Sequence, residues 1–271
     1  MEGRSVKSKG VIALVIVLIL LFAVTIYVDY DDTPLATLFA PPIPNQIYSP
    51  NVPRPDQKVV CIVFDDGWKN QLSAIPVLQS YGFNATFAIV TSYSTYPDYL
   101  SWKDIRGLAD DGMDIASHTV NHADLDHVDN AALTNELAQS QQTLRSRGYP
   151  ANVFVYPYGD AADNQTVRNA VAQYYLVARG TVEGKCNLAG FDRYNLQSYD
   201  VYHGVSMQDF AGFLNGTGGA TVTILYYHKI SNDNEDTSMS LATFQAQMQY
   251  LKDNGYTTQT LSGLFLKTVT S

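Results

Sequence analysis

Short apolar runs alternate with stretches that favour helices along most of the chain. The apolar runs are rich in β-branched residues and have the length of buried parallel strands. We expect strands at residues 59–64, 86–90, 115–117, 153–156, 175–178 and 221–227, and helices at residues 70–80, 102–110, 131–147, 164–173 and 241–253. Such alternation predicts parallel βαβ units.

The amino-terminal pattern is different. Arg4, Lys7 and Lys9 precede residues 11–28, a run of 18 residues without a charge. At ~1.5 Å per residue this run spans about 27 Å, enough for a transmembrane helix. The basic flank predicts a signal-anchor with residues 1–10 in the cytoplasm. A cleaved signal peptide is the alternative, but the run is longer than a usual signal core and no small-x-small site ends it.

Residues 29–56 predict an extended stalk between the membrane and a folded domain. The segment from residue 33 to residue 56 holds seven of the chain's eleven prolines. Proline and polar residues in this proportion favour an extended linker. Residues 57–271 then have the length of one domain of α/β barrel size.

Two adjacent carboxylates follow the first predicted strand. Asp65 and Asp66 come directly after residues 59–64, and Gly67 permits a sharp exit from the strand. The carboxyl ends of strands are where α/β folds place their chemistry. One carboxylate could hold a metal ion while its neighbour acts as a base. A turn with acidic caps is the alternative, because Asp-Gly is a common turn pair.

Three histidines lie at the ends of other predicted strands. His118 and His122 follow residues 115–117, and His228 follows residues 221–227. A spacing of four would place the first two on one face of a helical turn, within reach of one cation. A barrel is the favoured architecture, because single residues from several strand ends must converge on one metal ion.

The ordered motifs FDDG (64–67), SHTVNH (117–122), YPYG (156–159) and YYH (226–228) resemble those of the polysaccharide deacetylase family, also called the NodB-homology or carbohydrate esterase family 4 domain. The resemblance spans roughly residues 57–266. It implies a distorted (β/α) barrel that uses a divalent metal, with zinc expected, to hydrolyse N-acetyl groups of a polysaccharide. It assigns the general base to Asp65, the metal ligands to Asp66, His118 and His122, the general acid to His228, and oxyanion binding to the main chain of Tyr158.

The chain departs from the family pattern at one important position. Val155 stands where the family often has an arginine that braces the catalytic base. Arg179, at the end of the next predicted strand, could supply the missing guanidinium. Its alternatives are a solvated loop charge or a partner of Asp192. Tyr226, where leucine is common, leaves the shape of the acetyl pocket open.

Other functions of the same motifs stay open. An O-acetyl esterase would use the same residues, and the absent arginine would suit an inactive glycan-binding module.

The net charge of −9 argues against nucleic acid or anionic lipid as partners. Tyrosines at residues 93–99 could stack on sugar rings, although tyrosine-rich loops are also ordinary in exported proteins. We expect a monomer with its catalytic domain outside the cell and with Cys61 and Cys186 unpaired.

Overall fold

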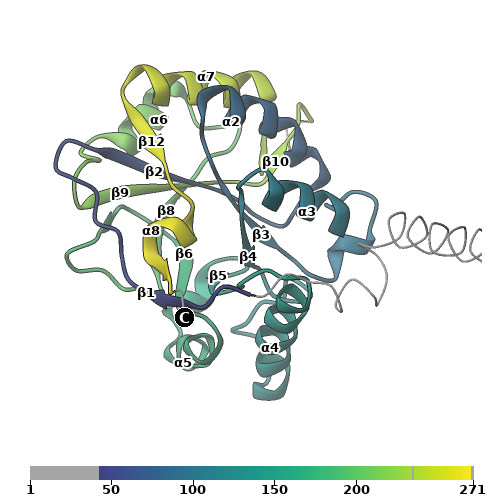
Figure 1. The fold of residues 1–271 in the computed structure, drawn as a ribbon. Helices are drawn as coiled ribbons and strands as arrows, with labels where there is room; N and C mark the ends of the chain where they lie inside the picture. The colour runs from purple at the N-terminus through teal and green to yellow at the C-terminus, as the bar shows by residue number, and fades with distance from the viewer. Residues whose placement is uncertain (1–42, 234, 270–271) are drawn as a thin grey trace, which may run out of the picture. The chain divides into compact units, whose positions relative to one another are not determined.

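Seven parallel strands close into a barrel in the computed structural model, which describes residues 43–233 and 235–269 (Figure 1). The barrel order is β2 (Lys58–Phe64), β3 (Thr86–Ile89), β4 (Asp114–Ser117), β5 (Val153–Val155), β6 (Val177–Glu183), β8 (Leu196–Asp200) and β9 (Thr221–Tyr227). The ring closes because β9 pairs with β2, from Val60 opposite Thr223 to Phe64 opposite Tyr227. The predicted α/β barrel is therefore present.

Helices connect the strands and cover the outside of the barrel. They are α2 (Ile75–Tyr81), α3 (Trp102–Asp110), α4 (Asn130–Ser146), α5 (Gln165–Tyr174), α6 (Met207–Leu214), α7 (Leu241–Asp253) and α8 (Leu261–Phe265). Figure 1 shows α2, α6 and α7 over one side of the barrel and α4 and α5 over another. The capping signals explain where several of these helices begin. Ser101 and Asp104 form a capping box at α3, and Asn164 caps α5.

The first strand shows how the barrel sorts its side chains. Val59, Cys61 and Val63 belong to an inner cluster with side chains of β4, β5 and β9, and residues of α8 join them. Val60, Ile62 and Phe64 belong to an outer cluster with α2, α3, α6 and α7. Successive residues of a strand point to opposite faces, so a strand buried on both faces must be apolar throughout. This explains the unbroken apolar run of β2.

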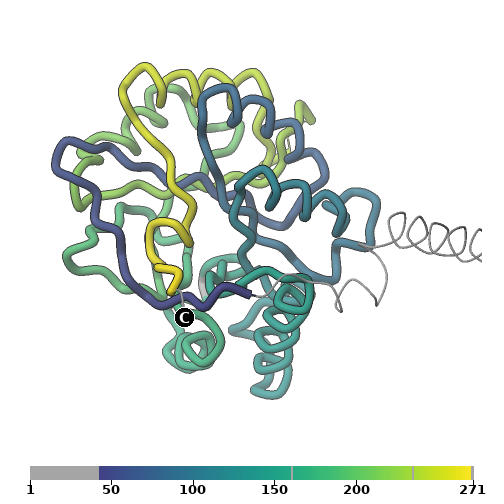
Figure 2. Tube along the Cα trace, in the orientation of Figure 1, coloured from purple at the N-terminus to yellow at the C-terminus, as the bar shows by residue number. Residues whose placement is uncertain are grey.

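Part of the predicted stalk is part of the domain. Strand β1 (Gln46–Tyr48) pairs antiparallel with β13 (Leu266–Thr268), so both ends of the described chain lie side by side (Figure 2). The Ser49 N–H also donates to the Phe265 carbonyl at 3.0 Å. The prediction that the linker continues to residue 56 is therefore wrong, since proline content alone does not exclude edge pairing. Residues 29–42 of the predicted stalk and the predicted transmembrane segment 11–28 lie outside the described residues.

Several element boundaries differ from the predictions. The predicted helix at 70–80 is a 3-10 helix, η2 (Lys69–Ala74), followed by α2, because Pro76 lacks an N–H and fits only the first turn of a helix. Strand β6 starts two residues later than predicted and runs on to Glu183. Strand β8 and helix α6 were not predicted. The short strands β7 (Cys186–Asn187), β10 (Lys229–Ile230) and β11 (Ser238–Met239) were not predicted either. The helix α7 is followed by strand β12 (Tyr256–Thr258), which pairs with β2, as the resemblance of this tail to the family implies.

Within residues 43–233 and 235–269, no helix combines the length and apolar composition needed to cross a membrane.

Candidate active site

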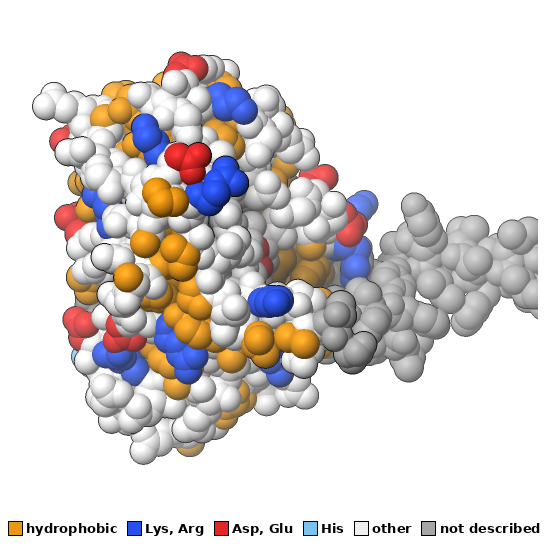
Figure 3. Space-filling view, turned by 60° about the vertical axis from the view of Figure 1, so that its left-hand side comes forward, with side chains coloured by type: hydrophobic (Ala, Val, Ile, Leu, Met, Phe, Trp, Pro, Cys, Tyr) orange, Lys and Arg blue, Asp and Glu red, His pale blue; other side chains and the backbone are white. Residues whose placement is uncertain are grey.

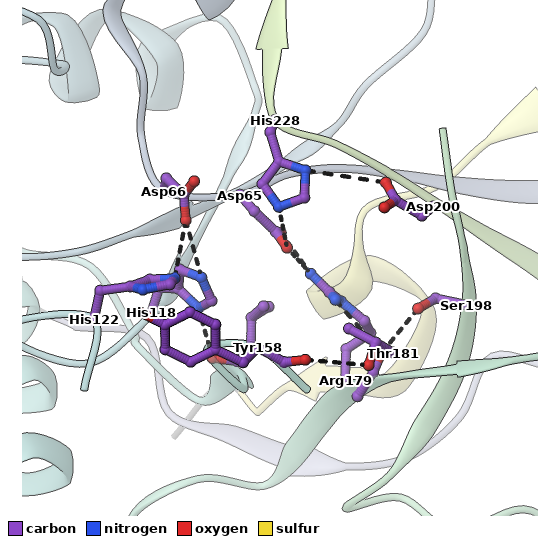
Figure 4. A network of polar contacts seen from close by, with 12 residues as sticks. Asp65, Asp66, His118, His122, Tyr158, Arg179, Thr181, Ser198, Asp200 and His228 are labelled. Carbon is purple, nitrogen blue, oxygen red and sulfur yellow. Dashed lines mark hydrogen bonds and ion pairs between the residues drawn. The ribbon is translucent and has the colours of Figure 1, made fainter. Parts of the chain in front are cut away.

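The two adjacent carboxylates at the end of β2 point to different partners. Asp66 (φ 71°) and Gly67 (φ 75°) both adopt left-handed backbone conformations, which turn the chain sharply out of the strand. The Asp65 side chain lies toward Arg179 and His228, whereas Asp66 lies toward His118 and His122 (Figure 4). One strand end therefore supplies two chemically separate carboxylates.

The Asp66 side of the site has the composition of a metal centre. Nε2 of His118 lies 3.3 Å from Oδ1 of Asp66, and Nε2 of His122 lies 3.2 Å from the same oxygen. The three potential ligand atoms all lie within 4.8 Å of one another. This is the set that the sequence predicts, and the structure brings it together from the ends of β2 and β4.

The surroundings of this set fit a divalent cation. Nδ1 of His118 lies 2.7 Å from the carbonyl oxygen of Val155, which leaves Nε2 free to act as a ligand. Oδ1 of Asp66 is buried and has no hydrogen-bond partner among the described residues. Burial alone would raise the pKa of Asp66, but the imidazoles of His118 and His122 outweigh it and hold this pKa well below its ordinary value. A carboxylate that stays charged beside two imidazoles suits zinc-like coordination.

The segment between the two histidines is a turn, which corrects the expectation of a helical face. Thr119 (φ 67°) and His122 (φ 57°) lie in the left-handed region, which an α-helix excludes. Buried Glu136 of α4 holds this turn. Its Oε2 accepts hydrogen bonds from the N–H groups of Val120 at 2.8 Å and Asn121 at 2.9 Å. The histidines therefore converge through a clamped turn.

The Asp65 side of the site is a buried ion pair next to an imidazole. The Arg179 guanidinium, which is fully buried, donates to both carboxylate oxygens of Asp65. The Nε2 atom of His228 lies 4.0 Å from Oδ2 of Asp65. Arg179 comes from β6, opposite Val155 in the register with β5. Asp192, the alternative partner considered for Arg179, pairs with Arg168.

Two residues of this region were missed from the sequence. Asp200, the last residue of β8, places Oδ1 4.0 Å from Nδ1 of His228. Burial raises the pKa of Asp200, the His228 imidazole opposes this rise and the Asp65 charge adds to it. Nε2 of buried Gln71 donates to the carbonyls of Asp65 at 2.6 Å and His228 at 2.9 Å. Recognising β8 as a strand would have put Asp200 at a strand end, whereas no signal in the sequence marks Gln71.

The YPYG segment (residues 156–159) lies next to the histidines and contacts His122 through Tyr158. The Tyr158 ring is exposed and meets the His122 ring edge-on at 4.6 Å between centroids. Tyr158 has φ 60°, and its carbonyl accepts a hydrogen bond from the Thr181 hydroxyl at 3.4 Å. A Cβ at Gly159 would lie 1.8 Å from Oγ1 of Thr181, so the backbone approaches β6 too closely for any other residue. The motif thus fixes Tyr158 beside the predicted metal ligands.

Comparison with known proteins agrees with the resemblance that the motifs carry. Residues 53–178 match the family model described as polysaccharide deacetylase. The resemblance to the polysaccharide deacetylase family is therefore confirmed over this part of the chain. The fold and the positions of the strand-end motifs agree with it, which supports a hydrolase.

This chain covers only part of the length of each relative. A gellan lyase of a Bacillus species is 36% identical over 53% of this chain, and YxkH of Bacillus subtilis (strain 168), assigned to the polysaccharide deacetylases, is 26% identical over 59%. The chain spans about 6% and 58% of the lengths of these two proteins. The structure of the Streptococcus pyogenes deacetylase PplD in complex with acetate superposes with a TM-score of 0.55 and 25% identity, covering 59% of this chain and 72% of that one.

Proposed function

We propose that this protein is a polysaccharide deacetylase that hydrolyses N-acetyl groups of an extracellular polysaccharide, with a divalent metal ion for which zinc is the expected identity. The observation that carries the proposal is the division between neighbouring carboxylates. Asp66 faces two imidazoles as a metal ligand would, while Asp65 faces a guanidinium and a third imidazole as a base would. A protein that only binds glycans would have little use for the second group, which is Asp65 with Arg179 and His228.

Asp66, His118 and His122 would hold the cation. When bound there, a divalent cation would polarise the acetyl carbonyl and make an attacking water more acidic. Asp65 is the group placed to accept the proton of that water. The Arg179 guanidinium contacts both of its oxygens, so the carboxylate is held in one orientation.

His228 and Tyr158 would complete the reaction. His228 lies on the opposite side of Asp65 from Arg179 and would donate a proton to the departing amine nitrogen, leaving a free amino sugar and acetate (Figure 4). Oδ1 of Asp200 lies 4.0 Å from Nδ1 of this imidazole, on the side away from Asp65 (Figure 4). The main-chain N–H of Tyr158 has no acceptor among the described residues, which suits a donor reserved for the acetyl oxygen.

The comparisons support the substrate class. The names of YxkH and of the Streptococcus pyogenes enzyme refer to deacetylation, and the latter was solved with acetate. The contact between Arg179 and Asp65 supports catalysis over the glycan-binding alternative, which rested on Val155 at the arginine position. An ester substrate would meet the same residues, so the experiment below includes one.

We also propose an anchored location outside the cytoplasm, which rests on the uncharged run at residues 11–28.

Acidic and basic side chains are interspersed on the face shown in Figure 3, so this face offers no basic field for a polyanion. Such a surface suits a neutral acetylated polymer as the partner.

Acetate release tests the proposal. The full chain in detergent should release acetate from N-acetylated glycans and lose this activity with a chelator, and an O-acetylated glycan in parallel identifies an esterase. Asp65→Asn and His228→Ala should keep the metal ion yet lose ~10²–10⁴-fold in rate. Asp56→Asn and His127→Ala, which change exposed groups, are the matched controls. Equal rates for Asp65→Asn and wild type would contradict the assignment.

A further inference from the structure

Three buried hydroxyl groups meet on the outer side of β4, and we name them the hydroxyl ring: Ser117 at the end of β4, Ser140 of α4, and Tyr175, which directly follows α5. The Oγ atoms of Ser117 and Ser140 lie 3.0 Å apart, and the Tyr175 hydroxyl lies 2.9 Å from each of them. Both serines are fully buried, and Tyr175 is 1% exposed. None of the three has a role in the reaction proposed above.

Each hydroxyl of the ring has one proton to donate. Burial raises the pKa of Tyr175 to about 12, so its hydroxyl keeps that proton at neutral pH. The Tyr175 hydroxyl donates to the Leu137 carbonyl at 2.9 Å, and the Ser140 hydroxyl donates to the Glu136 carbonyl at 2.7 Å. The Ser117 proton therefore remains for the ring itself, and within the described part of the chain its acceptors are Ser140 and Tyr175. Ser117 thus has two interchangeable acceptors.

Ser117 directly precedes a predicted metal ligand, and the two side chains point in opposite directions. Successive residues of a strand alternate between its faces. Ala116 belongs to the inner cluster of the barrel, and Ser117 points outward to α4. His118 points to the site, where its Nε2 lies 3.3 Å from Oδ1 of Asp66. The Ser117 hydroxyl therefore fastens β4 from outside at the residue before His118.

The ring also joins β4 to the helix that holds the histidine turn. Ser140 lies four residues after Glu136 in α4, so both side chains are on one face of the helix. Glu136 accepts hydrogen bonds from the turn that leads to His122, and Ser140 meets the end of β4. Apolar side chains at all three ring positions would leave no buried hydroxyl without a partner, at little cost in stability. Hydrogen bonds are directional, so their presence here suits the fixing of a direction better than the filling of a space.

We infer that the hydroxyl ring positions the metal centre: by holding Ser117 from outside, it fixes the direction in which His118 leaves β4, so that metal affinity depends on three hydroxyl groups that do not touch the metal. This inference rests on the metal site of the proposed function. Ser140 and Tyr175 act through Ser117 and are therefore positioning residues. Groups that orient a metal ligand directly contribute roughly 10- to 100-fold to metal affinity. Because the ring acts through the main chain of β4, we expect the lower end of this range, about 10-fold.

The first test measures zinc affinity by competition between the full chain in detergent and a chelating dye. Ser117→Ala should weaken zinc binding about 10-fold, and the double variant Ser140→Ala with Tyr175→Phe should do the same, since Ser117 then lacks both acceptors. Each of the latter two changes alone should weaken binding less than about 3-fold, because Ser117 keeps one acceptor. Tyr256→Phe, which removes a buried hydroxyl that donates to the Leu214 carbonyl at 3.2 Å, is the matched control and should not change the affinity. Zinc affinities of Ser117→Ala and of the double variant that both stay within about 2-fold of wild type would overturn the inference.

Hydrogen exchange of the metal-free protein separates this inference from the proposed function. Residues 117–122 should exchange their amide protons faster in Ser117→Ala and in the double variant than in wild type, because the end of β4 has lost its outer contact. Tyr256→Phe should leave the exchange of this segment unchanged. If wild type binds no zinc, the metal-dependent deacetylase proposal fails, and the exchange of this segment alone decides the role of the hydroxyl ring. Unchanged exchange in both ring variants, or an equal increase in Tyr256→Phe, would refute that role.

Discussion

Removing the guanidinium beside Asp65 should destabilise the protein strongly. Arg179 is fully buried and Asp65 is 3% exposed, and the two form a buried ion pair. The change Arg179→Met keeps most of the side-chain volume but leaves the carboxylate buried without its cation. Breaking a buried pair in this way costs ~3–5 kcal/mol in free energy of unfolding, because the remaining charge keeps its desolvation penalty.

A double-mutant cycle separates the ion pair from the loss of packing. Asp65→Asn alone leaves the guanidinium without its partner charge, and we expect a loss of similar size. The double variant Asp65→Asn with Arg179→Met contains neither charge, so it should be more stable than the sum of the two single losses predicts by at least ~1 kcal/mol. The Arg179 stack on the Tyr226 ring, at 4.4 Å, is lost in both variants that carry Met and cancels in the cycle.

The measurement is urea unfolding of the full chain in detergent, followed by near-ultraviolet circular dichroism. Arg168→Met is the matched control, because that guanidinium pairs with the exposed Asp192 and should cost at most about 1 kcal/mol. High salt should leave the effect of Arg179→Met unchanged, since buried pairs are screened little. An unfolding free energy for Arg179→Met within ~0.5 kcal/mol of wild type would refute the reasoning, as would strict additivity in the cycle.

Three further predictions concern the supports of the site and the anchor. Glu136→Gln should weaken metal binding by about 10- to 100-fold, because one amide oxygen cannot hold the histidine turn as the carboxylate does, and wild-type affinity in a competition with a chelating dye would contradict this. Gln71→Ala should lower the free energy of unfolding by ~1–3 kcal/mol, since the carbonyls of Asp65 and His228 lose their donor, and an unchanged urea midpoint would speak against it. The protein should stay in membranes after a carbonate wash, whereas a soluble form beginning near Ala40 would show a cleaved signal.

The sequence predicted the parts of the site that follow from strand ends. Asp65, Asp66, His118 and His228 each lie at the end of a predicted strand, and parallel strands deliver such residues to one end of a barrel. Arg179 was placed near the site only because Val155 left a position to fill. The structure shows how Arg179 reaches the place of the missing arginine, since it lies opposite Val155 in the pairing of β5 with β6. Register between neighbouring strands is what a linear pattern does not contain.

Site residues that do not follow an apolar strand were not predicted from the sequence. Strand β8 carries the mixed sequence Leu-Gln-Ser-Tyr-Asp, which lacks the apolar run of the other barrel strands, so Asp200 at its end gave no signal. Gln71 and Glu136 act by hydrogen bonds to main-chain groups of loops. Their partners depend on where those loops fold, and any polar residue at a helix surface carries the same signature.

The backbone conformations of the site argue that it is built for function at some expense of stability. The non-glycine residues with positive φ in the described part of the chain are Asp66, Thr119, His122, Ala151 and Tyr158. All except Ala151 belong to the loops that follow β2, β4 and β5 and hold the predicted metal ligands and oxyanion donor. Each such residue costs ~1–2 kcal/mol relative to an ordinary conformation. Glycine would relieve that cost, but at Asp66 and His122 it would also remove the ligand. The strain is therefore tolerated where a side chain is needed and where the barrel beneath is fully buried, which is the pattern expected of an active site.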